Sequence, residues 1–154
     1  MRNLWSILLI LLLGATPGWA ALGQYASSID LDQQVLGCGR RELARQGYTV
    51  HELISPHGLV VKEFVSSQGM VFGVTWQAPH MPNLQQLLGG DNMIELHQAL
   101  SSRPRYHSGA PLIVRTPKLV FVSGGHMRSF HGYAYVPGLI PANFPVAVIH
   151  DTQN

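Results

Sequence analysis

Charged residues are scarce in this chain. They make up 12% of its 154 residues, and the formal charge at pH 7 is only +2. A protein that binds nucleic acid usually presents a strongly basic surface to the phosphates. The low charge therefore argues against a nucleic-acid partner. The hydrophobic fraction of 46% is enough to fill a core, so we expect a folded protein rather than a disordered chain.

Cysteine is almost absent too, since Cys38 is the only one. An exported chain with one cysteine cannot close an internal disulfide, so its stability must come from packing. Long hydrophobic runs are missing beyond the N-terminal region. No later segment approaches the roughly 20 apolar residues that a membrane-spanning helix needs, so none is predicted there.

The N-terminal region has the three parts of a secretory signal peptide. Met1–Asn3 carries positive charge, Leu4–Leu13 is an almost uninterrupted apolar run, and Gly14–Ala20 ends in small residues. We therefore predict cleavage between Ala20 and Ala21. The product is expected to be periplasmic or secreted.

Beyond the signal peptide, residues 1–20, the length of residues 21–154 suits a single domain. Residues 21–47 are polar and weakly periodic, which predicts a loop-rich lead-in with a short helix. Residues 137–154 are rich in proline and are expected to form an irregular strap, in which Val146–Ile149 could be an edge strand.

Three strands are predicted after the lead-in. The segments are rich in β-branched and aromatic residues and cover Tyr48–Ile54, Leu59–Val65 and Met70–Trp76. The separators end in Gly58 and Gly69, which can adopt the positive φ of a tight hairpin turn. We therefore expect a three-stranded antiparallel meander. Strand alternation would place Phe72, Val74 and Trp76 together on the core face.

A broken helix and a second hairpin are predicted next. Pro82–Leu88 is a helix that Gly89 and Gly90 stop, and Asn92–Leu100 is its continuation. Leu112–Arg115 again has strand character. Two further strands flank a predicted turn at Gly124-Gly125: Leu119–Ser123 and His126–Val136. This order of elements predicts an α+β fold, in which a helix packs on one antiparallel sheet.

Several short segments carry a family resemblance. Ala21-Leu22-Gly23 follows the predicted cleavage point, and five segments come after it in order: Tyr48–Glu52, Val61–Val65, Val71–Gln77, Pro82–Gly89 and Ser123–Phe130. With them the chain resembles a family of exported proteins from Gram-negative bacteria, catalogued as domain of unknown function number twenty-eight forty-four. The resemblance covers nearly all of the chain beyond the signal peptide. It implies export and a single domain, with no assigned activity or site.

Eight histidines invite a test for metal binding. Ligands on one strand or helix face are two, three or four residues apart, and no two of these histidines have such a spacing. His126 and His131 are the nearest in number, but on one strand they would point to opposite faces. The sequence therefore predicts no metal site and no cofactor, although a site assembled across strands stays open.

Glu52 and Glu63 form the most informative pair. A two-residue turn at His57-Gly58 would place them directly opposite each other, where like charges are unfavourable. Three explanations are open. The face is solvated or the register is shifted; a cation from Arg128 or Lys62 lies between them; or the two acids form a catalytic or metal-binding pair.

The second predicted hairpin offers a candidate contact surface. A turn at Gly124-Gly125 would place Arg128 opposite Phe121. His131, Tyr133 and Tyr135 would then alternate onto the other face. Side chains of this kind combine an apolar body with a polar tip, which suits contact with a ligand or partner. The alternative is a sheet face that the helix covers.

No nucleophile elbow, metalloprotease helix motif or phosphate-binding loop is present. We therefore expect an exported, soluble envelope protein that acts by binding or as a structural domain, with an envelope ligand or protein as its partner. The candidate binding residues are Glu52, Glu63, Arg128, His126, His131 and Tyr133. The competing hypothesis is a metal-binding or acid-pair enzyme that uses Glu52, Glu63 and a histidine.

Overall fold

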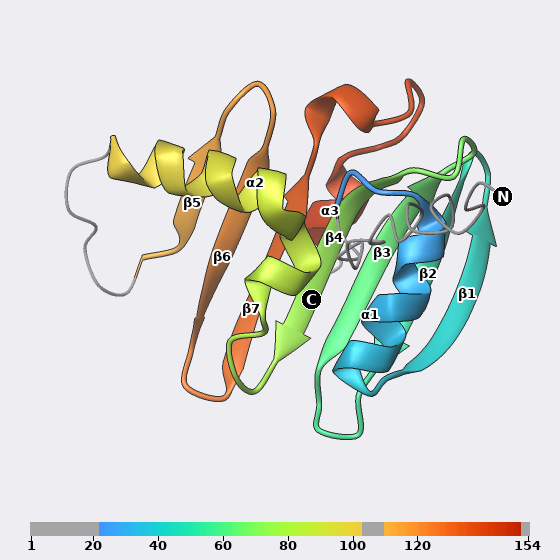
Figure 1. Cartoon of the computed structure of the whole chain (residues 1–154), viewed down its shortest axis with the longest axis horizontal. Helices are drawn as coiled ribbons and strands as arrows, with labels where there is room; N and C mark the ends of the chain where they lie inside the picture. The colour runs from blue at the N-terminus through green and yellow to red at the C-terminus, as the bar shows by residue number, and fades with distance from the viewer. Residues whose placement is uncertain (1–21, 103–109, 152–154) are drawn as a thin grey trace, which may run out of the picture.

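The computed structural model describes residues 22–102 and 110–151 (Figure 1). The predicted signal peptide, residues 1–20, and its cleavage point lie outside these residues. Within them, seven strands form one antiparallel sheet in the order β1-β2-β3-β4-β7-β6-β5. The strands are β1 (Gly39–Arg45), β2 (Tyr48–Ile54), β3 (Val60–Ser66), β4 (Val71–Ala78), β5 (Leu112–Arg115), β6 (Val120–His126) and β7 (Ser129–Tyr135).

Helices and turns cover both faces of this sheet (Figure 1). The short helix η1 (Ala26–Ser28), α1 (Ile29–Leu36) and α2 (Leu84–Ser101) lie on one side, which we call the helix face. The other side carries residues 137–151, with η2 (Pro137–Leu139) and α3 (Ala147–Asp151). We call these residues the C-terminal segment and the side that they cover the segment face. The predicted α+β class is therefore confirmed.

Two segments form other elements than the sequence predicted. The predicted lead-in contains β1, a charged edge strand that pairs with β2 along its whole length. Strands at a sheet edge are often charged, which hides them from a search for apolar alternation. The predicted edge strand over Val146–Ile149 is largely helical, since α3 begins at Ala147. This helix places Ile149 against Gly73 of the sheet. A Cβ on Gly73 would lie 2.8 Å from Ile149 Cδ1, so glycine permits this close packing.

The break in α2 is confirmed. Asn83 caps the helix, with its Oδ1 accepting a hydrogen bond from the Gln86 N–H at 3.3 Å. Gly89 interrupts the helix with φ 75° and ψ 167°. No helix among the described residues has both the length and the apolar composition needed to cross a membrane.

The β2–β3 hairpin has a three-residue loop rather than a two-residue turn. Ser55 and Leu59 close it, with the Ser55 N–H donating to the Leu59 carbonyl at 2.8 Å, and Gly58 takes φ 86°. This moves the predicted register by one residue. A shift of one residue turns a side chain to the other face, so the predicted pairing of the two glutamates is wrong.

The β6–β7 hairpin turns at Met127-Arg128, where Arg128 has φ 69°. The predicted turn at Gly124-Gly125 is wrong, as is the pairing of Arg128 with Phe121. Both glycines lie within β6. A Cβ on Gly125 would lie 2.0 Å from the Ser129 carbonyl oxygen, so glycine here allows close approach of the backbones.

Trp76 lies in the core of the helix face, as predicted, and is 2% exposed. It packs over Gly132, where a Cβ would lie 2.2 Å from Trp76 Cζ2. Val74 shares this face, but Phe72 does not. A β-bulge leaves Phe72 without a partner in β3, and its ring packs against Phe64 on the segment face at 6.2 Å between centroids.

Candidate functional site

The residues predicted as binding candidates lie in three separate places. Glu63 is on the helix face, whereas His131 and Tyr133 are on the segment face with Glu52. His126 and Arg128 lie at the exposed end of the β6–β7 hairpin. The structure therefore forms no site that contains Glu52, Glu63 and Arg128 together.

Glu52 is held between two cations. β1, β2 and β3 align Arg41, Glu52 and Lys62 in one row across the sheet. Arg41 forms an ion pair with Glu52 Oε2, and Lys62 Nζ lies 3.6 Å from Glu52 Oε1. Of the two cations considered from the sequence, Lys62 is therefore beside a glutamate, and Arg128 is not. Arg41 was missed because β1 was not predicted.

Glu63 instead meets an acid that the sequence analysis did not select. Asp32 of α1 is fully buried and Glu63 is 2% exposed. No donor reaches the buried oxygens Asp32 Oδ2 and Glu63 Oε2, and the two carboxyl groups lie close enough for a hydrogen bond between them. Gln86 of α2 donates its side-chain N–H to Asp32 Oδ1. Two carboxyl groups can bond in this way only when a proton lies between them. α1, α2 and β3 thus meet at two buried acids, and one proton held between them would give both unpartnered oxygens a hydrogen bond.

Burial and the neighbouring carboxyl group determine the state of this pair. Burial raises the pKa of Glu63 well above its ordinary value of 4.5, and the hydrogen bond to Asp32 and its charge raise it further. Burial also raises the pKa of Asp32, against the lowering effect of its hydrogen bonds to Glu63 and Gln86. We assign the retained proton to Glu63, which donates it to Asp32.

A second polar group lies beside this acid pair. His51 is directly opposite Glu63 across β2 and β3. Arg40 of β1 donates from Nε to His51 Nδ1 at 3.1 Å and forms an ion pair with Asp30 of α1. Burial lowers the pKa of His51, and the charge of Arg40 lowers it further. Because Arg40 can only donate, His51 Nδ1 accepts, and the neutral ring carries its proton on Nε2.

A signal for the buried acid was present in the sequence. Ile29, Asp32 and Leu36 are three and then four residues apart, which places them on one side of a helix. When an acid lies between two apolar residues on one side of a helix, the pattern predicts that the acid is buried with them. Among the described residues, no group of three or more His, Cys, Asp or Glu side chains is arranged to hold a metal ion.

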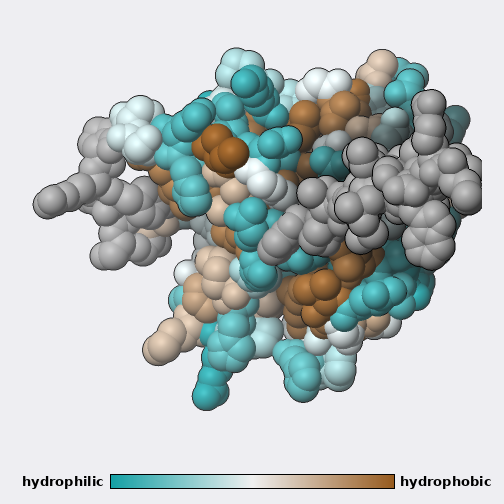
Figure 2. All heavy atoms as spheres, viewed as in Figure 1, coloured by the Kyte–Doolittle hydropathy of each residue, from teal (hydrophilic) through white to brown (hydrophobic). Residues whose placement is uncertain are grey.

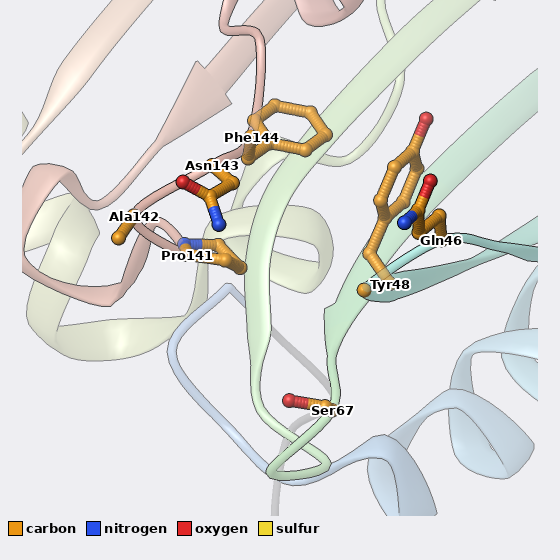
Figure 3. A pocket seen from close by; sticks show the side chains of 8 residues that line it. Gln46, Tyr48, Ser67, Pro141, Ala142, Asn143 and Phe144 are labelled. Atoms are coloured by element: carbon orange, nitrogen blue, oxygen red, sulfur yellow. The ribbon is translucent and has the colours of Figure 1, made fainter.

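A hollow of about 180 Å³ lies on the segment face, where the β1–β2 and β3–β4 turns meet the C-terminal segment. Figure 3 shows Gln46 and Tyr48 on one side of it, Pro141, Asn143 and Phe144 on the other, and Ser67 near the β3–β4 turn. The Tyr48 and Phe144 rings meet edge to face, with 4.9 Å between centroids. None of the described residues that line the hollow is charged.

Tyr133 is mostly covered. Its ring packs beside that of His150 in α3 at 4.7 Å between centroids and stacks with Tyr135 at 6.3 Å. The face that carries His131, Tyr133 and Tyr135 is therefore a packed face. The C-terminal segment covers it, rather than the predicted helix.

The coloured part of the helix face is a mixture of hydrophilic and hydrophobic residues. Figure 2 shows this side, with hydrophobic atoms in separate places, including some over α2. The largest exposures of hydrophobic side chains belong to Met127 and Tyr25, at 87% and 66%. These two lie in different parts of the chain, and single exposed hydrophobic residues are common on protein surfaces.

Comparison with known proteins found no match among curated proteins and none among solved structures. One family model matches residues 18–149, which is most of the chain and includes every element of the sheet. This agrees with the resemblance seen in the sequence. The chain belongs to the family described as Protein of unknown function (DUF2844).

Proposed function

We propose that this protein is an exported envelope protein that acts by binding, with the hollow beside Tyr48 as its contact site. The proposal rests on the difference in accessibility between the buried acids and the open hollow. The acids that could do chemistry, Asp32 and Glu63, are 0% and 2% exposed, so a substrate has no access to them. The hollow is open and combines aromatic and amide groups, which are groups that bind ligands without reacting with them.

The lining favours a neutral, polar ligand. Tyr48 offers part of its ring, with the buried Phe144 ring packed behind it, while Gln46, Ser67 and Asn143 offer hydrogen-bond donors and acceptors. Since the described lining has no charged side chain, nothing in it would compensate for the desolvation of a charged ligand. A sugar ring has the matching chemistry, with apolar C–H groups and hydroxyl groups. We therefore propose a neutral envelope glycan as the ligand.

Export is the part of this proposal that rests on sequence. The basic start, the apolar run and the small residues before Ala21 support it. N-terminal sequencing of protein recovered from the periplasm or medium should begin at Ala21. A membrane-bound product that retains Met1 would contradict export as a soluble protein.

Binding is best tested by NMR titration of the labelled protein with a chitin hexamer and a cellulose hexamer. We expect shifts of Gln46, Ser67 and Asn143 with at least one of them, and loss of these shifts in Asn143→Ala. Asn143 is exposed, so its replacement should not disturb the core. Gln68→Ala changes an exposed residue beside Ser67 that does not line the hollow, and it should bind like the wild type.

Two results would contradict the proposed site. Shifts that persist in Asn143→Ala would place binding elsewhere. Shifts with an anionic galacturonate oligomer, but with neither neutral sugar, would contradict the inference from the uncharged lining. An absence of shifts with all three sugars would reject the glycan.

A further inference from the structure

Helix α1 is attached to the sheet by few buried groups. Of its eight residues only Ile29 and Asp32 are buried, and its N-cap residue, Ser28, makes no capping bond through its side chain. Leu36 packs against the core but is only partly buried, and Asp30, which forms an ion pair with Arg40, has a 69% exposed side chain. Solvent weakens such an exposed pair. Docking of α1 therefore depends on Ile29, on the partly buried Leu36 and on the carboxyl group of Asp32.

We propose that α1 is a proton-dependent cover on the helix face, held down by the proton that Asp32 shares with Glu63 and released when that proton is lost. This inference is independent of the proposed ligand. Without the proton, two buried carboxylates would face each other where water does not compensate them. The charge repulsion is relieved if one of them moves into solvent.

The architecture determines which acid would move. Glu63 is in β3, which is bonded to β2 on one side and to β4 on the other. Asp32 is in a short helix that ends at Gly37, a residue in the left-handed conformation at φ 60°. Before the helix, Gly23 and Ala26 are tied by backbone hydrogen bonds to Val71 and Gly69. Displacement of α1 between these two ends would disturb less hydrogen bonding than displacement of β3.

The charged and titratable neighbours come from four elements. α1 contributes Asp30 and Asp32, β1 contributes Arg40 and Glu42, β2 contributes His51, and β3 contributes Glu63. α2 contributes the uncharged Gln86. Arg40 is the one group among them that favours ionised Glu63, but it already bonds to Asp30 and His51. Burial of Glu63 prevails, and its pKa lies above the ordinary value.

Hydrogen–deuterium exchange can test the cover directly. Protection of the α1 amides, corrected for intrinsic exchange, would be measured from about pH 5.5 to about pH 9 in the wild type and in Glu63→Gln. As pH rises from the ordinary pKa of 4.5 toward the raised pKa of the buried pair, wild-type protection should fall by up to about tenfold per pH unit, and it should level off once the pair has lost its proton. The amide introduced by Glu63→Gln is neutral and keeps a donor toward Asp32, so α1 should stay protected throughout. Glu42→Gln removes a neighbouring but exposed carboxylate and should follow the wild type.

Each alternative outcome contradicts the proposal. Constant protection of α1 in the wild type means that no proton controls it. An equal loss in Glu63→Gln assigns the effect to another group. Simultaneous loss of protection in β4 and β7 means that the pair supports the whole fold instead of a cover. If Glu63→Gln does not fold, Asp32→Asn makes the same test, since its amide can donate to an ionised Glu63, and it should also give constant protection.

Discussion

The two faces of the β2–β3 hairpin each bury a glutamate, but the neighbours of the two glutamates are opposite in charge. On the segment face, Glu52 lies between Arg41 and Lys62 and is ion-paired with both. On the helix face, Glu63 lies against another acid and retains a proton. Both glutamates are buried, at 7% and 2% exposure. Burial alone therefore does not decide whether a carboxyl group is charged; the neighbouring group does.

This difference has consequences for the function that each face can have. The ion-paired row is charged, includes Arg41 with a 63% exposed side chain, and can exchange its partners with solvent. The acid pair is buried, so loss of the proton between its two carboxyl groups is costly. The charge state of the helix face thus depends on one proton, while the segment face has aromatic packing and the hollow that we propose as the contact site.

The largest expected effect concerns the core of the helix face. Trp76→Ala should lower the free energy of unfolding by roughly 3 to 5 kcal/mol, because it empties a buried aromatic site above Gly132. Urea denaturation would measure the change, with Trp76→Phe as a milder control. A loss below about 1 kcal/mol would show that this face is not the tightly packed one.

The pH dependence of stability is the next largest effect. Glu63 keeps its proton in the folded protein at pH values where the unfolded chain has lost it, since the ordinary pKa is 4.5. The folded state then binds more protons, so stability falls as pH rises, by about 1.4 kcal/mol per pH unit for one proton. His51 should not oppose this trend above about pH 6.5, because its pKa is lowered from that ordinary value.

Glu63→Gln should abolish this alkaline loss and make the protein more stable than the wild type at neutral and alkaline pH. Chemical denaturation across pH would measure both curves. An unchanged slope in the variant, or a wild type whose stability does not fall above about pH 6.5, would contradict the shared proton.

His51 should produce a smaller effect on the acid side. Its pKa is lowered from the ordinary value of 6.5, so the unfolded chain takes up a proton before the folded protein does. Stability from this residue is therefore lost as pH falls below 6.5 toward the lowered value. His51→Gln keeps an acceptor for Arg40 and should flatten this loss, which denaturation at mildly acidic pH would detect. A steeper loss in the variant would assign it to another group.

The sequence predicted the class of the fold better than its registers. Strand segments, the broken helix and the buried Trp76 follow from local periodicity, which acts within one element. The register of β2 and β3 depends on whether the loop has two or three residues, and one glycine fits either. Since that single residue moves Glu52 and Glu63 to opposite faces, the predicted acid pair failed although a real one exists nearby.

The real pair was hidden by distance along the chain. Asp32 and Glu63 belong to α1 and β3, and no pairing rule within a hairpin connects them. The predicted turn at the two glycines of β6 was wrong for another reason. Gly124 and Gly125 have the composition of a turn, but the turn lies at Met127-Arg128, where Arg128 itself takes a positive φ. Glycine signals either a turn or close backbone approach, and only the neighbouring strand distinguishes the two.

The smallest expected effect comes from the ion-paired glutamate, and its sign is the sharpest contrast with Glu63. Glu52→Gln should destabilise the protein at neutral pH by about 1 kcal/mol or less, because Arg41 and Lys62 are partly exposed and solvent screens both pairs. The loss should shrink further at high salt. Glu63→Gln is the same substitution, but it removes no charge from the folded protein because Glu63 keeps its proton there, and it should stabilise the protein under those conditions. Denaturation of both variants in low and high salt would make the comparison. If both variants shift stability in the same direction, the two glutamates do not differ as their neighbours indicate.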